Sequence, residues 1–254
     1  MSLFPTIAIV PARGGSKGLP GKNLRRLGGL PLVAHSVRFA QLCPEINRCV
    51  VSTDSEQIAH AAREAKGDVP FLRPSELSED STPMLSVVQH AIQNVEQLEG
   101  RHYEFVILLQ PTSPFRLPED VSRALEIIRH DSAAVGVVAV STPSFNPRVV
   151  CVEEKQGYLD FAFEKKLYMR RQDAKPVYRI NGMLYVWKRD YLIQTLPEHL
   201  YSEPHRILVV PEERAIDIDT LHDFQLAEAM LQAGMLHLPW SEDCRSEFET
   251  IEKS

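Results

Sequence analysis

The residues best suited to chemistry stand in one short stretch, residues 11–23, where four glycines are interspersed with Arg13, Lys17 and Lys22. Glycine lets the backbone turn tightly and bring its N–H groups close to a ligand. The cations add charge-assisted donors for oxyanions. An apolar run at 7–10 directly precedes the stretch and predicts a buried strand. We interpret the stretch as a cradle for a nucleotide triphosphate, and a basic surface turn is the plainer alternative.

Two familiar phosphate-binding patterns do not fit this stretch. Five residues separate Gly15 from Gly21, and Asn23 stands where a Walker A loop needs a hydroxyl residue. A dinucleotide fingerprint is also excluded, because no helical pattern opens at the end of the stretch; the next begins near Pro31. The loop is therefore long enough to fold over a ligand.

Asp217 and Asp219 alternate on a short extended segment, which predicts that both carboxylates point the same way. Two close carboxylates repel each other unless a cation lies between them. Mg²⁺ fits this place because it uses few protein carboxylates together with phosphate oxygens. The alternative for Asp219 is that it caps the helix that follows.

Other polar residues follow predicted strands. Gln110, with Thr112 and Ser113, leaves the apolar run 105–109 and could orient a sugar or an acid, or form only a proline-rich turn. Arg73 could face a base carbonyl or a phosphate, or lie on the surface. Asn181, before Gly182, could mark no more than a bulge in a strand.

The order of the elements predicts how these residues meet. Strands are predicted at 7–10, 49–52, 69–72, 105–109 and 134–140, and helices at about 31–42, 56–66, 83–98 and 119–129. Such alternation is typical of a parallel sheet with helices on both faces, whose ligands bind beyond the carboxyl ends of the strands. The loops 11–23, 53–55, 73–82 and 110–116 all fall at those ends.

The rhythm changes after residue 140. Residues 143–178 predict a β-rich insert, which could be a flap, a dimer arm or a solvated excursion. Strands at 178–187 and 207–210 and a helix at 221–233 follow. The tail from residue 235 has no periodicity and is either a loose terminus or a small packed extension.

Composition excludes several classes. A formal net charge of −6 argues against nucleic-acid binding, and no apolar run is long enough to span a membrane. The start of the chain shows no signal-peptide pattern. The cysteines (Cys43, Cys49, Cys151 and Cys244) and the nine histidines show no metal-type spacing, so a zinc site is not expected. The scattered cysteines also predict free thiols and a location in the reducing cytoplasm.

Taken together, several segments resemble the acylneuraminate cytidylyltransferases, the CMP-sialic acid and CMP-legionaminic acid synthetases. They are Pro-Ala-Arg-Gly-Gly-Ser-Lys at 11–17, Gly-Lys-Asn at 21–23, Ser-Thr-Asp-Ser at 52–55, Arg-Pro at 73–74, Leu-Gln-Pro-Thr-Ser-Pro at 109–114, Asn-Gly at 181–182 and Ile-Asp-Ile-Asp-Thr at 216–220. The resemblance covers roughly residues 6–232 in order, without a large gap.

This resemblance implies a three-layer nucleotide-diphospho-sugar transferase (Rossmann-like) fold over residues 1–234, with a dimerisation insert at about 143–178 and a C-terminal tail at 235–254. It implies a cytoplasmic homodimer that joins CTP to a nine-carbon 2-keto acid sugar, giving the CMP-sugar and pyrophosphate. The Ser-Lys-Gly-Leu-Pro-Gly-Lys form of the loop is similar to members acting on legionaminic-type sugars as well as sialic acid. Related enzymes transfer other nucleotides, including a guanylyl group to an amino-sugar phosphate, which is the alternative activity.

The resemblance also implies roles for individual residues. Nucleotide binding falls to the loop and to residues near the cytidine, and substrate binding to two amides. Asp217 and Asp219 bind Mg²⁺ and, with Arg13 and Lys22, form the catalytic set. The nucleotide-binding residues are Ala12, Arg13, Gly14, Gly15, Lys22, Asn23 and Arg73, with Ser81 or Thr82, and the substrate-binding residues are Gln110 and Asn181.

Overall fold

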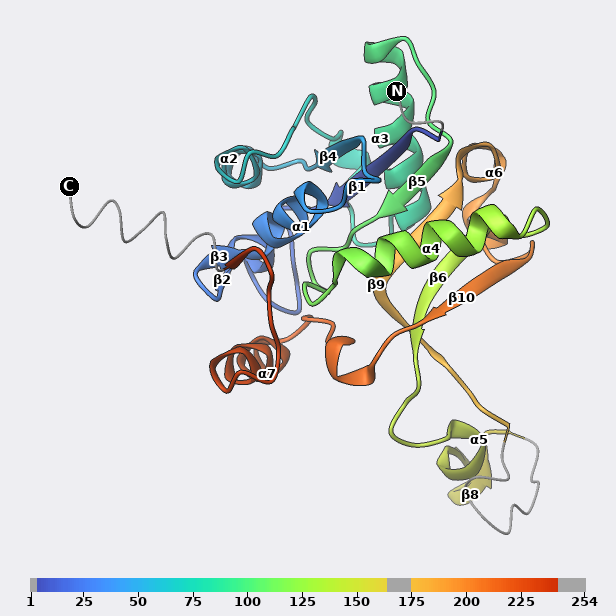
Figure 1. Ribbon diagram of the computed structural model, residues 1–254. Helices are drawn as coiled ribbons and strands as arrows, with labels where there is room; N and C mark the ends of the chain where they lie inside the picture. The colour runs from blue at the N-terminus through green and yellow to red at the C-terminus, as the bar shows by residue number, and fades with distance from the viewer. Residues whose placement is uncertain (1–3, 164–174, 242–254) are drawn as a thin grey trace.

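The computed structural model describes residues 4–163 and 175–241 (Figure 1). Its centre is a six-stranded sheet with the strand order β10-β6-β9-β5-β1-β4. Strand β1 pairs in parallel with β4 and β5, and β10 pairs in parallel with β6, whereas β9 runs antiparallel to β5 and β6. The sheet is therefore mostly parallel, as predicted. Its strands are β1 (Thr6–Pro11), β4 (Arg48–Ser52), β5 (Phe105–Leu108), β6 (Gly136–Ser141), β9 (Arg179–Lys188) and β10 (His205–Val209).

Alternate residues of these strands enter two separate apolar cores. Ala8 and Val10 of β1 pack into a core shared with α1, α2, α4 and α7, while Ile7 and Ile9 pack into a core shared with α3 and α6. Figure 1 shows α1 and α4 crossing one face of the sheet. The result is the predicted three-layer α/β architecture. The helices are α1 (Leu32–Gln41), α2 (Glu56–Glu64), α3 (Met84–Glu99), α4 (Pro118–His130), α6 (Arg189–Gln194) and α7 (Leu221–Gln232).

The strand predicted at 69–72 is wrong. The segment forms no ladder and pairs with the chain around β4 only through two isolated bridges, Asp68 with Val50 and Leu72 with Thr53. Pro70 lies between these bridges and Pro74 follows them, and a proline has no N–H to give to a ladder. The segment still follows the edge strand β4, which places Arg73 beside the end of that strand.

Two further parts lie outside the sheet. A short helix, α5 (Pro147–Val150), and a hairpin of β7 (Val152–Lys155) with β8 (Tyr158–Phe161) project away from the main body (Figure 1). They occupy the predicted insert, of which residues 164–174 lie outside the described part. A second hairpin, β2 (Arg26–Leu27) with β3 (Leu30–Pro31), links the glycine-rich loop to α1.

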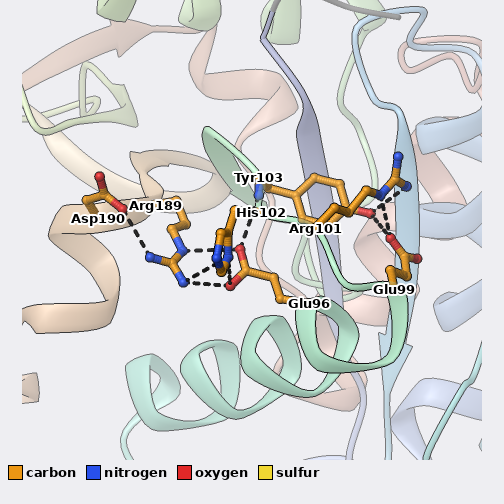
Figure 2. Close-up of polar contacts among 7 residues, drawn as sticks. All are labelled: Glu96, Glu99, Arg101, His102, Tyr103, Arg189 and Asp190. Atoms are coloured by element: carbon orange, nitrogen blue, oxygen red, sulfur yellow. Dashed lines mark hydrogen bonds and ion pairs between the residues drawn. The ribbon is translucent and has the colours of Figure 1, made fainter.

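The end of the sheet at which β5 begins is held by a network of ion pairs, shown in Figure 2. Arg189 donates to both carboxylate oxygens of Glu96, at 3.1 and 2.6 Å. The Tyr103 N–H and the His102 ring also contact this carboxylate, at 3.1 and 3.0 Å. Burial alone would raise the pKa of Glu96, but these partners hold it below its usual range. The network ties the end of α3 to the start of α6.

The start of the predicted tail is a packed extension. Leu236, Leu238 and Trp240 are buried in the core around α1, and residues 242–254 of the tail lie outside the described part. The indole N–H of Trp240 donates to Nδ1 of His35 at 2.9 Å, and Nε2 of His35 lies 2.9 Å from the Leu27 carbonyl. Because Nδ1 accepts, the proton of a neutral His35 ring must sit on Nε2. Burial lowers the pKa of His35 to about 4.

We expect this histidine to make stability depend on pH. Its pKa is lower in the folded protein than the ordinary 6.5, so the unfolded chain binds the extra proton first as the pH falls. The free energy of unfolding should be highest above about pH 6.5 and decline towards pH 4, with His35 contributing on the order of 3 kcal/mol in all. Urea unfolding at several pH values should show a flatter decline for His35→Gln than for wild type. The exposed His60 provides the control, and an equal slope in His35→Gln and His60→Gln would contradict the assignment.

Candidate active site

The predicted loops meet at a cavity of about 330 Å³ beyond the carboxyl ends of β1 and β5. Both cations and acids line it, together with neutral hydrogen-bonding groups. Of the residues singled out from the sequence, the lining includes Arg13, Lys22, Asn23, Arg73, Thr82, Gln110, Asp217 and Asp219. These residues come from four segments far apart in the chain, and the ends of the strands bring them together.

Among the described residues, the other predicted nucleotide-binding residues do not line this cavity. The N–H of Ala12 donates to the Ser52 carbonyl at 3.0 Å, which extends the pairing of β1 with β4. The N–H of Gly14 donates to Oδ1 of Asp54 at 2.9 Å. Gly15 and Ser81 are exposed. Two of the amides assigned to phosphate from the sequence therefore already have an acceptor, and Thr82 rather than Ser81 lines the cavity.

The glycine-rich loop keeps its shape through short-range and long-range contacts. Gly21 has a φ of 67° and begins a tight turn over Lys22–Leu24. The side chain of Asn23 is buried and donates to the Arg13 carbonyl at 3.0 Å, which closes the loop on itself. A Cβ on Gly18 would lie 2.6 Å from the Asp219 carbonyl oxygen, so only glycine permits this approach. The loop is thus seated against the segment that carries the two acids.

Each cation of the loop has an acidic partner. Nζ of Lys22 lies 2.7 Å from Oδ1 of Asp219, and the Lys22 side chain is only 13% exposed. Asp80 pairs with Lys17, and with Arg13 at 2.5 Å. Hydrogen bonds from Lys17 and then Arg13 hold the pKa of Asp80 below its usual range. An anion that enters the loop must therefore compete with Asp80 for these two cations.

Asp217 is the less satisfied of the two acids. Its Oδ1 is buried without a hydrogen-bond partner. Burial raises the pKa of Asp217, the Thr112 hydroxyl opposes this by a hydrogen bond, and the charge of Asp219 raises it further. Asp219 does not cap α7, because Thr220 does so by accepting from the Asp223 N–H at 3.3 Å. Neither carboxylate therefore caps the helix, and both line the same cavity.

The donor set fits a magnesium ion. Among the described residues, no group of three or more acidic, histidine or cysteine side chains could hold a metal. Mg²⁺ needs fewer protein ligands than that, because it keeps waters and takes oxygens from a phosphate. A cation at Asp217 would supply the partner that its buried Oδ1 lacks.

A neutral polar wall stands beside the acids. Gly182 has a φ of 75° and lies where the register between β9 and β6 is irregular, so the predicted bulge is present. A Cβ there would lie 2.8 Å from Oε1 of Gln110 and 3.2 Å from Oγ of Ser113. Ser113 Oγ and the Nδ2 of the neighbouring Asn181 are buried without hydrogen-bond partners. Gln110 lines the cavity, whereas Ser113 and the predicted substrate-binding residue Asn181 lie buried behind its lining.

Arg73 is not a surface residue. Its side chain is 3% exposed, and Nε donates to the Ser78 hydroxyl at 3.1 Å. Its Nη2 has no hydrogen-bond partner and lies 3.7 Å from Oδ1 of Asp54. Burial lowers the pKa of Arg73, and the nearby Asp54 partly offsets this. A guanidinium with a free donor in this cavity offers a charge-assisted hydrogen bond to a nucleotide.

Sequence reasoning did not assign roles to Asp54, Asp80 and Arg116, all of which shape the site. Asp54 and Asp80 stood inside segments already noted, and an acid close to a cationic loop was the available signal. Arg116 is wholly buried and donates to the carbonyls of Gln110 and Met183. No local pattern distinguishes it from a surface arginine.

Comparison with known proteins shows which family has this fold and sequence. The family model described as "Cytidylyltransferase" matches residues 7–232. The chain is 37% identical over 233 residues to CMP-N,N'-diacetyllegionaminic acid synthase of Legionella pneumophila, covering 89% of this chain and 96% of that protein. It is 30% identical over 226 residues to N-acylneuraminate cytidylyltransferase of Escherichia coli, covering 89% of this chain and 52% of that protein.

A solved structure shares the fold. It is CMP:2-keto-3-deoxy-manno-octonic acid synthetase complexed with CTP, with a TM-score of 0.67, 20% sequence identity, and coverage of 91% of this chain and 99% of that chain. The predicted nucleotidyltransferase fold is thereby confirmed. With the family model spanning nearly the whole described body, the chain belongs to the cytidylyltransferase family and is a nucleotidyltransferase.

Proposed function

We propose that this enzyme joins CTP to a nine-carbon 2-keto acid sugar of the sialic or legionaminic acid type, giving the CMP-sugar and pyrophosphate. One observation carries the proposal: the cationic loop, the Asp217/Asp219 pair and the amide of Gln110 line a single cavity at the carboxyl ends of the strands. The named relatives act on acids of this class, at 37% and 30% identity.

In the proposed reaction the anomeric hydroxyl oxygen of the sugar forms a bond to the α-phosphorus of CTP. The bond from that phosphorus to the bridging oxygen breaks, pyrophosphate leaves, and the hydroxyl gives up its proton. Such transfers depend chiefly on positioning and on neutralising charge. Arg13 and Lys22 would hold the triphosphate, with Lys22 stabilising the leaving pyrophosphate. Arg73 and Thr82 would lie nearer the nucleoside.

Asp217 and Asp219 are the residues that would hold Mg²⁺. When bound, the ion would neutralise phosphate charge and lower the pKa of the attacking hydroxyl. Lys22 already lies 2.7 Å from Asp219, so this acid can link the metal position to the cation that faces the phosphates. The half-buried Asp217 accepts a hydrogen bond from Thr112, which orients its carboxylate.

The acceptor sugar would bind against the neutral wall. Gln110 lines the cavity, while Asn181 and Ser113 each have a buried polar atom that lacks a partner. Hydroxyl and carboxylate groups of an acidic sugar would satisfy these donors and acceptors without adding a second fixed charge. This assignment supports an acidic sugar as acceptor and leaves its substituents to experiment.

We also propose that two chains associate through the insert. Tyr158 is 78% exposed, Leu159 68% and Phe163 45%, and all three belong to or follow the projecting β7-β8 hairpin (Figure 1). Exposed apolar groups gathered on a projecting hairpin are typical of an interaction surface.

No helix in the described ranges is long and apolar enough to cross a membrane. Cys43, Cys49 and Cys151 are free thiols, which is compatible with the cytoplasmic location predicted from the sequence.

The reaction is tested by pyrophosphate release with Mg²⁺ across CTP, GTP, UTP and ATP. The acceptors are sialic, legionaminic and pseudaminic acids, a shorter keto-deoxy acid and glucosamine phosphate. We expect release only with CTP and a nine-carbon acid. Asp217→Ala and Asp219→Ala should each lower this rate by at least roughly a hundredfold, as loss of a transition-state charge contact does.

The exposed Asp190, which pairs with Arg189 in the network of Figure 2, provides the matched control for these acids. Asp190→Ala should keep the wild-type rate. Release with GTP and a sugar phosphate would replace both the base and the acceptor in this proposal. Wild-type turnover in both site variants would exclude the metal role of Asp217 and Asp219.

Asp80 should compete with phosphate for the loop. We expect Asp80→Asn to bind inorganic pyrophosphate about two- to fivefold more tightly, because exposed ion pairs are weak and little is lost when they are removed. The gain should shrink at high salt. Isothermal titration calorimetry measures both effects. Glu76→Gln makes the same charge change in the same segment, where the carboxylate contacts Ser75 instead of a cation. Weaker binding by Asp80→Asn would mean that Asp80 helps to hold the ligand.

Light scattering tests the association. At micromolar concentration we expect about twice the 28.7 kDa mass of one chain. Leu159→Glu should shift the mass towards one chain, because it places a charge on the apolar hairpin. Leu98→Glu, at a 67% exposed position on α3, should leave the mass unchanged. A wild-type mass of one chain would count against the dimer.

A further inference from the structure

The turn after β4 carries an acid that the proposed reaction does not use. Residues 53–55 join β4 to α2, and Asp54 lies in the middle of this turn. One of its oxygens, Oδ1, accepts the Gly14 N–H at 2.9 Å. The same oxygen lies 3.7 Å from Nη2 of Arg73. One carboxylate of Asp54 thus contacts the glycine-rich loop and lies near the buried guanidinium of Arg73, which lines the cavity.

The turn itself is held firmly. The Ser55 N–H donates to the Thr53 hydroxyl at 3.1 Å, and the Ser55 hydroxyl accepts the Ile58 N–H at 3.4 Å, which caps α2. Thr53 is fully buried. A side chain carried by such a turn has few orientations open to it. Asp54 can therefore hold Gly14 and Arg73 at fixed positions relative to β4.

The glycine-rich loop fits closely against this turn. A Cβ on Gly14 would lie 3.2 Å from the Cβ of Ser55 and 3.7 Å from the other carboxylate oxygen of Asp54. A side chain at position 14 would therefore press on the turn that carries Asp54. Arg13, the residue just before Gly14, lines the cavity, so the Asp54 contact fixes the backbone next to a cation of the site.

Arg73 is held by the same turn from the opposite side. The backbone N–H of Arg73 donates to the Thr53 carbonyl at 2.7 Å, while its guanidinium faces Asp54. The side chain is 3% exposed, and its Nη2 lacks a hydrogen-bond partner. A buried guanidinium is costly without an acid nearby, and Asp54 supplies that charge without satisfying the free donor. The donor is left for a ligand.

We propose that Asp54 is a positioning residue that sets the triphosphate loop and Arg73 relative to each other, so that both ends of one nucleotide are bound through a single carboxylate. The proposal rests on the proposed function, since it takes the ligand to be a nucleoside triphosphate. Its two contacts differ in kind. The contact with Gly14 needs only an acceptor oxygen, whereas the effect on Arg73 needs the negative charge.

Asp54→Asn and Asp54→Ala separate these contacts. The asparagine retains an acceptor oxygen for Gly14 but removes the charge, and the alanine removes both. Asp68→Asn is the matched control, because Asp68 also pairs with an arginine, Arg48, at the opposite end of β4. Thermal unfolding of all three variants checks that each is folded before binding is measured.

Titration calorimetry with two probes gives the test. Inorganic pyrophosphate reports on the loop, and CTP with Mg²⁺ reports on both ends of the site. For Asp54→Asn we expect CTP to bind roughly tenfold more weakly while pyrophosphate binds within about twofold of wild type. For Asp54→Ala we expect both ligands to bind roughly tenfold more weakly. A purely structural role would weaken both ligands equally in the two variants.

The outcomes separate this inference from the proposed function. CTP affinities in both Asp54 variants that match Asp68→Asn would overturn the positioning role while leaving the reaction intact. Equal loss of pyrophosphate binding in Asp54→Asn and Asp54→Ala would overturn the division between acceptor and charge. If the wild-type protein binds none of CTP, GTP, UTP and ATP, the proposed function fails and the role of Asp54 fails with it.

Discussion

The arrangement of the site depends on one buried guanidinium. Arg116 is wholly buried and donates to the carbonyl of Gln110, at the end of β5, and to the carbonyl of Met183, in β9. Its Nη1 also donates to the Ser36 hydroxyl of α1 at 3.2 Å. Burial lowers the pKa of Arg116 to about 9, so it stays charged at neutral pH. These hydrogen bonds join α1 to the end of β5, next to Gln110, and to β9, which carries Gly182. They therefore fix the distance between the two strands that form the neutral polar wall.

Around this frame, the cavity is balanced in charge by its own residues. Asp219 faces Lys22, Asp80 faces Arg13 and Lys17, and Asp54 faces Arg73. Binding a triphosphate with a divalent cation would therefore exchange partners more than create new charge contacts. The Asp80 pairs are solvent-exposed, and Asp219 is 66% exposed although its partner Lys22 is 13% exposed, so these contacts exchange at little cost. The Arg73 side chain is 3% exposed and that of Asp54 26%, so this contact exchanges less readily.

Local patterns were enough to predict most of the fold and the meeting of the polar loops at one cavity. Apolar runs gave the strands, and polar residues after each run gave the loops that meet at the cavity, because the carboxyl ends of parallel strands share one edge. The 69–72 segment failed because its apolar character resembles a strand while Pro70 cannot join a ladder. Asp54, Asp80 and Arg116 were missed since their roles come from partners up to 80 residues away in the chain. Trp240 illustrates the limit, as its acceptor on His35 is 205 residues distant.

The two ends of the sheet differ in how well their buried polar groups are hydrogen-bonded. At one end, the Glu96 carboxylate meets Arg189, His102 and the Tyr103 N–H, so a buried charge is fully satisfied (Figure 2). At the other end, Asp217 Oδ1, Ser113 Oγ, Asn181 Nδ2 and Arg73 Nη2 are buried without partners. Such atoms destabilise a protein unless something else supplies their hydrogen bonds. Asp217 and Arg73 line the cavity, so a bound cation would complete the hydrogen bonding of the first and a phosphate oxygen that of the second, whereas Ser113 and Asn181 lie outside its lining.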